Sequence, residues 1–365
     1  MIKFFFFKLI LKFLLCSNFL FSAYLKNIPV ELIQPDGSKI NCLTSGDEFY
    51  NYLHDKNDFT IIQSSEDGYY YYAVKSNNTL IPSFYRVNSV NPQDVGLDSG
   101  QRISLSEYKL KKQVYLENVE YRDAPTLGTV NNLNVFIRFD GEEEFPNSRA
   151  YYDVPFNNPD GPSMLHYFEE VSYNLLTVNT FHFPQCDFST NISYQDEYPR
   201  DYYKPYNEIT NPIGYQNDNQ SRSREHILLK NAIEFIADEV PEDLDIDSDN
   251  DGYVDNVTFL VRGIPGAWAD LLWPHRWALY SEEAYINGLR VYDYNLNLEQ
   301  GGYFTVGTLC HEFFHSLGAP DLYHYWDDIS PVAVGGWDVM DASSDIPQSM
   351  SAYMKYRYTE WITDL

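Results

Sequence analysis

Between residues 28 and 90, apolar and polar residues alternate in short runs separated by turn-forming residues. The segments PVELIQPDGSKINCL and DFTIIQSSEDGYYYYAV each contain an Asp-Gly pair, which begins at Asp36 and at Asp67. Alternation with a period of two is typical of strands with one buried face, and Asp-Gly between such runs favours a hairpin turn. The pattern therefore predicts a small β-rich unit near the N-terminus.

The pattern changes after residue 90. Residues 91–125 are polar and include a lysine-bearing, helix-like segment (SLSEYKLKKQVYLENVEY), which is expected to connect two domains. From Leu133 onward, strand patterns such as LNVFIRF, TVNTFHF and NVTFLVRG alternate with helix patterns. Among the helix patterns, SMLHYFEEVSYNLL and SREHILLKNAIEFIADEV carry apolar residues at a spacing of three or four. This alternation predicts an α+β fold for the second half of the chain.

A chain of 365 residues can form two domains that each bury their own core. We expect an N-terminal domain with its connector at residues 24–125 and a second domain at residues 126–365. The last strong helix pattern, FTVGTLCHEFFHSLG, is expected to form a central helix of the second domain. It is predicted to end at Gly318, because glycine and a following proline, Pro320, stop a helix.

The first 23 residues resemble a secretory signal peptide. They contain an early lysine, a long apolar run and the small pair Ser22-Ala23. Lys8 and Lys12 interrupt the apolar run, which argues against a membrane-spanning helix. The alternative is an anchor that is not cleaved. We therefore expect residues 1–23 to be a signal peptide and the mature protein to be secreted.

Charge and cysteine content limit the partners and the kind of scaffold that this chain can have. A formal net charge of −28 makes binding to nucleic acid or to an anionic membrane unfavourable. After removal of the signal peptide three cysteines remain, Cys42, Cys186 and Cys310, so at most one disulfide can form within the chain. A disulfide-rich scaffold is thereby excluded.

The sequence CHEFFHSLGAPDLY contains two histidines, His311 and His315, with a glutamate directly after the first. Residues four apart on a helix lie on one face, because each residue turns the helix by about 100°. Two imidazoles at this spacing can bind one Zn²⁺, and Glu312 can then act as general base toward a water at the metal. The motif predicts metal-assisted hydrolysis of a peptide bond.

A catalytic zinc site needs a third protein ligand. The motif continues as H-E-x-x-H-x-x-G-x-x-D, which places Asp321 where metzincins have a third histidine. Gly318 can adopt a positive φ and turn the chain, and Met340 in GGWDVMD follows at a distance suitable for the Met-turn of that class. The alternative third ligand is Glu360 in EWITD, which resembles the glutamate-bearing helix of the other large HExxH class.

A second candidate metal site is the acidic loop DSDNDGYVD. Carboxylates at alternating positions, followed by glycine at position six, are typical of a Ca²⁺-binding loop, to which the carbonyl at position seven also contributes. Thr258 occupies position twelve, where an EF-hand has glutamate, so another carboxylate such as Asp243 or Asp245 must complete the shell. The alternative is a solvated acidic turn. The predicted calcium ligands are Asp247, Asp249, Asp251, Tyr253 and Asp255.

HEFFHSLGAPDLY and GGWDVMD resemble the immune inhibitor A family of secreted zinc metallopeptidases, whose members carry HExxHxxGxPDxY and a W-x-x-M-x segment. The stretches QPDG, GDEFYNYL, EVSYNLLTV, DNDGYVDNV and WPHRW agree with the same family. The resemblance extends over most of the chain from about residue 28. Two departures are Phe314, where a small residue is usual, and His324, where an aspartate commonly follows the tyrosine.

The resemblance implies a metzincin-like catalytic domain at residues 126–365, preceded by a β-rich propeptide domain. It implies His311, His315 and Asp321 as zinc ligands, Glu312 as base, and proteins or peptides as substrates. The alternative from another class is a catalytically inactive, secreted calcium-binding or adhesion module that retains the peptidase fold.

Three other residues suggest weaker hypotheses. His275 in LLWPHRW either faces the site or is a packed structural histidine, and Tyr323 either stabilises an oxyanion or packs near the metal. Cys42 lies in the expected propeptide, where a thiolate can bind zinc and keep a peptidase latent. A buried or disulfide-bonded Cys42 is the alternative.

Overall fold

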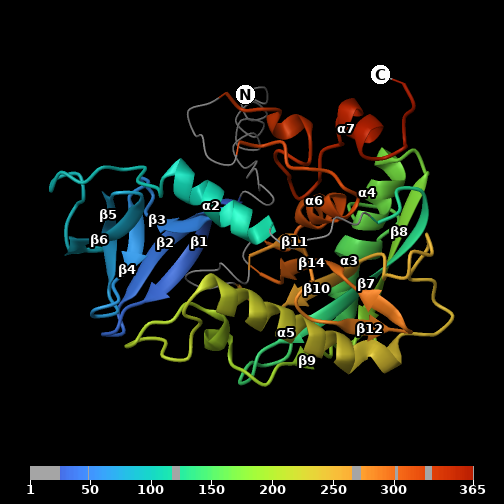
Figure 1. The fold of residues 1–365 in the computed structure, drawn as a ribbon, viewed down its shortest axis with the longest axis horizontal. Coiled ribbons are helices and arrows are strands. Elements are labelled where there is room, and N and C mark those ends of the chain that lie inside the picture. Colours follow the sequence, from blue (N-terminus) through green and yellow to red (C-terminus); the bar gives the residue numbers. More distant parts are fainter. Residues whose placement is uncertain are drawn as a thin grey trace, which may run out of the picture.

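A computed structural model of the chain describes residues 25–47, 49–116, 124–264, 273–300, 303–324 and 331–364. The predicted signal peptide at residues 1–23 lies outside this part. The described residues form an antiparallel sheet near the N-terminus and a second, mixed sheet with helices on both faces (Figure 1). Within them, no helix combines the length and the apolar character needed to cross a membrane.

Six strands form the N-terminal sheet, and each pairs antiparallel with the next along the sequence. The two predicted Asp-Gly hairpins are confirmed, because Gly37 (φ +82°) joins the first pair and Gly68 (φ +72°) joins the fourth and fifth strands. Cys42 and Tyr72 are part of its apolar core. The strands are β1 (Leu25–Ile33), β2 (Lys39–Gly46), β3 (Asn51–His54), β4 (Thr60–Gln63), β5 (Tyr70–Ser76) and β6 (Thr79–Arg86).

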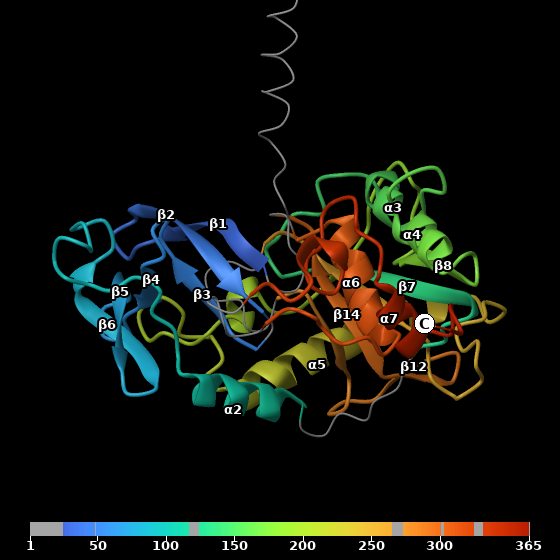
Figure 2. The ribbon, with the colours of Figure 1, turned by 90° about the horizontal axis from the view of Figure 1, so that it is seen from above.

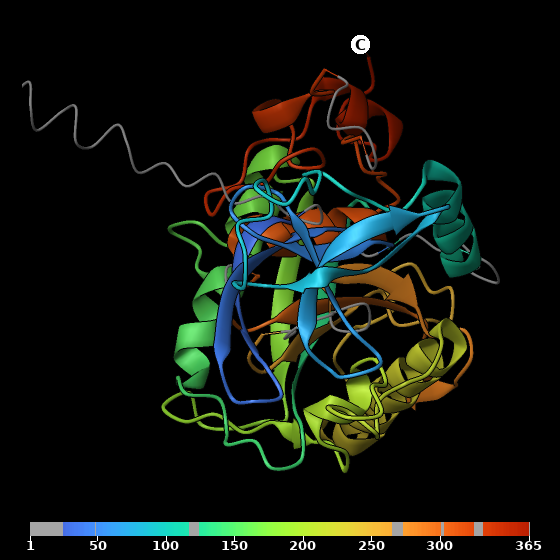
Figure 3. The same cartoon turned by 90° about the vertical axis from the view of Figure 1, so that its left-hand side faces the viewer.

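The N-terminal sheet contacts the second domain through β1 and through the end of β4, and β6 lies far from it (Figures 1 and 2). Ile28 of β1 belongs to the main apolar cluster of the second domain. The amide of Asn207 donates to the Ser64 carbonyl at 3.2 Å, and Gln63 Nε2 donates to Thr210 Oγ1 at 3.1 Å. Seen from its outer side, the sheet stands in front of the second domain (Figure 3).

Four neighbouring strands of the second sheet are parallel, and one edge strand is antiparallel to them. The order is β11-β14-β10-β7-β8, and β9 continues alongside the end of β7. The strands are β7 (Gly128–Arg138), β8 (Leu176–Phe183), β9 (Tyr194–Gln195), β10 (Val257–Val261), β11 (His275–Ala278) and β14 (Asp293–Leu298). A separate hairpin contains β12 (Ala284–Ile286) and β13 (Leu289–Val291).

Helix α5 covers one face of this sheet, and α3, α4 and α6 cover the other. The α-helices are α2 (Leu105–Leu116), α3 (Arg149–Asn157), α4 (Met164–Val171), α5 (Asp218–Ile236), α6 (Val306–Ser316) and α7 (Ala352–Arg357). Short 3-10 helices are η1 (Arg200–Tyr203), η2 (Ala237–Glu239) and η3 (Gly335–Trp337). Helix α4 ends earlier than its apolar pattern indicates, because Tyr173 (φ 61°) and Asn174 (φ 62°) leave the right-handed region.

The sheet face beneath α6 carries a connected set of buried polar side chains. Asn256 Nδ2 donates to Asn132 Oδ1 at 2.7 Å, and Ser316 Oγ at the end of α6 donates to Asn256 Oδ1 at 3.0 Å. Asn295 Nδ2 donates to the main-chain carbonyl of Glu312 at 3.0 Å. Buried polar groups of this kind are stable only when they are paired, so these bonds fix where α6 rests on the sheet.

Candidate metal centre

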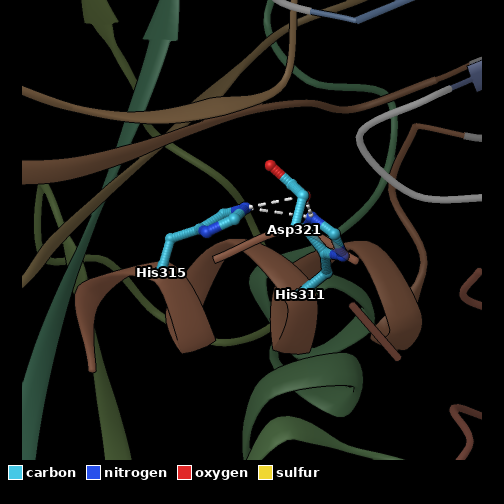
Figure 4. A group of neighbouring side chains, drawn as sticks. All are labelled: His311, His315 and Asp321. Carbon is cyan, nitrogen blue, oxygen red and sulfur yellow. Dashed lines mark hydrogen bonds and ion pairs between the residues drawn. The ribbon is translucent and has the colours of Figure 1, made fainter. Parts of the chain in front are cut away.

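Helix α6 spans Val306–Ser316 and ends two residues before the predicted stop at Gly318. Thr305 is the N-cap, and its hydroxyl accepts from Thr308 N at 3.1 Å. Gly318 has φ +87°, which confirms the predicted left-handed turn after the helix. His311 and His315 therefore project from the same side of α6, one turn apart, with ring centroids 4.7 Å apart (Figure 4).

The turn after α6 brings Asp321 to the two imidazoles (Figure 4). Its Oδ1 lies 2.9 Å from His311 Nε2 and 3.3 Å from His315 Nε2, and the two Nε2 atoms are 3.0 Å apart. Three ligands at about 2.0–2.1 Å from a tetrahedral zinc ion are about 3.3 Å from one another. The spacing of these three atoms therefore fits a zinc site without rearrangement of the chain.

Main-chain carbonyls hold both imidazoles in the orientation that a metal ligand needs. His311 Nδ1 donates to the Val339 carbonyl at 2.9 Å, and His315 Nδ1 donates to the Ala319 carbonyl at 2.7 Å. Each ring thus keeps a proton on Nδ1, which leaves Nε2 as the nitrogen that would bind a metal once its own proton is lost. Met340 is fully buried and its carbonyl accepts from Leu322 N at 2.9 Å, next to Asp321.

The buried charges of the cluster shift one another's pKa. Burial alone would raise the pKa of Asp321, but the neighbouring imidazoles hold that pKa well below its usual range. Burial alone would lower the pKa of His315, but the Asp321 carboxylate raises it to about 9. A carboxylate that stays ionised in a buried site is a suitable ligand for a divalent cation.

Glu312 lies next to His311 on α6, and its side chain is 1% exposed. Among the described residues, its Oε1 has no hydrogen-bond partner. Burial raises the pKa of Glu312, which is the expected direction for a carboxyl group that exchanges protons. The orphaned oxygen beside the three ligands fits a general base that meets a water molecule at the metal.

Several other predicted residues lie apart from this cluster. Glu360 is exposed and does not join it, so the structure brings Asp321 and not Glu360 to the histidines. Cys42 is buried in the N-terminal sheet, where burial raises the pKa of its thiol to about 12. The three cysteines in the described part are free. His275 is buried and contacts Glu225 of α5 at 3.0 Å. Burial would lower the pKa of His275, but the Glu225 carboxylate and, more weakly, Glu312 raise it, so His275 also lies within electrostatic reach of Glu312. Tyr323 is buried.

Asp47 of the N-terminal domain lies within electrostatic reach of the cluster. The sequence did not single out this residue. Asp47, in the turn between β2 and β3, is 1% exposed and accepts hydrogen bonds from Tyr50 N (2.8 Å) and from the Tyr108 hydroxyl of α2 (2.9 Å). Burial, together with the charge of Asp321, raises the pKa of Asp47 to about 7. This turn therefore approaches the predicted zinc site.

The acidic loop forms the second cluster with metal-ligand spacing. Carboxylate oxygens of Asp247, Asp249 and Asp251 lie within 4.8 Å of one another. Asp255 lies outside this group and accepts hydrogen bonds from Ser248 N and Oγ. A cavity of ≈20 Å³, large enough for one water molecule or ion, is bordered by Asp249, Asp251, Tyr253, Asp255 and Asp293, among others.

Comparisons with known proteins add no relative. No protein-family model matches the chain, and no curated protein matches it. The functional interpretation therefore depends on the geometry of the two clusters and on the sequence motifs.

Proposed function

We propose that this protein is a secreted, zinc-dependent endopeptidase of the immune inhibitor A type, with a metzincin-like catalytic domain. The observation that carries the proposal is the convergence of His311, His315 and Asp321 beside the unpaired, buried Oε1 of Glu312. Protein and peptide chains are the proposed substrates. The N-terminal domain is the proposed propeptide, supported by the approach of the Asp47 turn to the cluster.

Zinc, held by His311, His315 and Asp321, would polarise the scissile carbonyl and lower the pKa of the attacking water. Glu312 Oε1 accepts the proton that this water loses as its oxygen attacks the carbonyl carbon. Glu312 then gives the proton to the amide nitrogen, so that the C–N bond breaks and the amine leaves. The two Nδ1 hydrogen bonds keep the imidazoles fixed throughout.

The decisive experiment replaces Glu312 by glutamine. Because the ligands are untouched, Glu312→Gln is expected to keep one zinc per chain and to lose casein cleavage by about 10²–10⁴-fold. Glu360→Gln, which changes an exposed carboxylate outside the cluster, is the matched control and keeps activity. Cleavage by Glu312→Gln at the wild-type rate would contradict the mechanism.

We further propose that Ca²⁺ binds the Asp247–Asp249–Asp251 cluster in a structural role. This cluster and its cavity also favour the second candidate function, an inactive calcium-binding or adhesion module. That alternative requires calcium binding without zinc and without cleavage. Metal analysis of the purified protein, together with the casein assay, separates the two functions.

A further inference from the structure

Asn297 of β14 is a buried amide with no partner in the described part of the chain. It is 0% exposed, and neither its Oδ1 nor its Nδ2 makes a hydrogen bond. An unpaired buried amide costs about 1–3 kcal/mol per group, so its presence calls for an explanation. Leucine in the same place would avoid that cost.

Strand alternation places the Asn297 side chain beneath α6. Successive side chains of a strand point to opposite faces, so Asn297 faces the same side as Asn295. Asn295 Nδ2 donates to the Glu312 carbonyl and, at 3.2 Å, to Ser316 Oγ. Tyr294, Leu296 and Leu298 belong instead to the apolar cluster that includes α5.

The direction of α6 shows which part of the helix lies over Asn297. Ser316, at the end of α6, bonds to Asn256 just before β10, whereas Phe304, before α6, packs against the apolar cluster that contains Leu260, near the end of β10. Because β10 and β14 are parallel to each other, helix α6 therefore runs antiparallel to both strands. Asn297 is in register with Leu260, about 6.6 Å beyond Asn295 toward the start of the helix.

Helix geometry predicts the same direction for the Glu312 side chain. Side chains of an α-helix tilt toward its N-terminus, which takes the Glu312 carboxylate from the position over Asn295 toward Asn297. Both groups are buried, and each has an atom without a partner: Glu312 Oε1 and the Asn297 amide. A single ordered water satisfies two such groups when they face the same space.

We propose that Asn297 is a positioning residue for Glu312, and that its amide binds the Glu312 Oε1 through one buried water. The contact holds the carboxylate in the rotamer that reaches the attacking water. The catalytic part of this inference rests on the proposed function, whereas the Asn297–Glu312 contact itself does not. Loss of an outer partner of this kind typically lowers activity 10–100-fold.

The contact is tested by a stability cycle that needs no activity. The thermal midpoint is measured for the wild type, Asn297→Leu, Glu312→Leu and the double variant. In the wild-type background, Asn297→Leu removes the partner of the Glu312 carboxylate. In the Glu312→Leu background there is no carboxylate to lose a partner. We therefore expect Asn297→Leu to change the thermal midpoint several degrees more favourably in the Glu312→Leu background than in the wild type. Equal changes in both backgrounds overturn the proposal. If leucine prevents folding, Asn297→Val enters the same cycle.

Kinetics test the positioning role. Asn297→Leu is expected to lower kcat about tenfold or more, with KM and zinc content unchanged. Thr258→Val is the matched control, because Thr258 lies on the same sheet face and its hydroxyl bonds to Asn132 and, at 3.4 Å, to Asn256, but to no residue of α6. It is expected to keep kcat. An unchanged kcat in Asn297→Leu overturns the positioning role. If the wild type does not cleave, the proposed function fails, while the stability cycle still decides the contact.

Discussion

His311 Nδ1 and the carbonyl of Val339 are 2.9 Å apart, so a predicted zinc ligand is held by the chain segment that carries Met340. Met340 supports the other side of the site through its bond to Leu322 N. Met340→Ala is expected to destabilise the fold by about 2–5 kcal/mol, because the side chain is fully buried, and to weaken zinc binding about tenfold. Urea unfolding and zinc titration measure the two effects. If a clearly destabilised Met340→Ala variant bound zinc with wild-type affinity, Met340 would not contribute to holding the zinc ligands.

The third zinc ligand can be identified by a pair of substitutions. Asp321→Ala is expected to reduce zinc affinity by at least 10²-fold, because it removes the only carboxylate within the histidine cluster of the described residues. Glu360→Ala, which removes an exposed side chain, should bind zinc like the wild type. Competition with a chromophoric chelator gives both affinities. The reverse result would support the Glu360 alternative.

Calcium is expected to stabilise the folded protein through the acidic loop. A ligand present at 100 times its Kd adds about 2.7 kcal/mol to the free energy of unfolding, so calcium should raise the thermal midpoint and a chelator should lower it. Asp249→Asn combined with Asp251→Asn should abolish this response. Asp160→Asn, an exposed acid elsewhere, serves as control. A calcium response that survives the double substitution would place the site elsewhere.

Asp47 makes stability depend on pH. Its folded-state pKa of about 7 exceeds the ordinary value of about 3.9, so the folded protein retains a proton that the unfolded chain releases between those values. This contribution favours folding at acid pH and is lost as the pH rises through 7. Asp47→Asn should therefore stabilise the protein by on the order of 4 kcal/mol at pH 8 and hardly at pH 4.

Denaturant unfolding at the two pH values measures this difference. Asp94→Asn, which changes an exposed acid of the same domain, is the control and should have little effect at either pH. A gain of equal size at pH 4 and pH 8 would show that the Asp47 carboxyl does not titrate in this range.

Local signals in the sequence were sufficient for the elements that carry the site. Helical spacing and the stop at Gly318 predict α6, and the Asp-Gly pairs predict two hairpins, because these features depend on residues within one turn of each other. The departure at Phe314 is also explained: its ring packs on Phe168 (centroids 5.0 Å apart) and Trp361 (5.7 Å), within the apolar core and not at the zinc ligands. His324 is exposed.

Contacts between distant segments could not be read from one sequence. Asp47 and Asp321 are 274 positions apart in the chain, and only the docking of the N-terminal sheet brings their charges together. Asp293 borders the acidic loop because β14 pairs beside β10, which no spacing in DSDNDGYVD indicates. In the same way, alternation predicts that Asn297 lies on one face of a strand but not which helix covers it.

The polar side chains of the sheet face beneath α6 also fix the position of that helix along its axis. A displacement of α6 by one turn, about 5.4 Å, would separate Asn295 from the Glu312 carbonyl and Ser316 from Asn256. Each buried group left unpaired would cost about 1–3 kcal/mol, whereas a purely apolar face would allow the helix to slide at little cost. The amides therefore permit a single position of α6 along the strands, and with it a single position of Glu312 along the sheet.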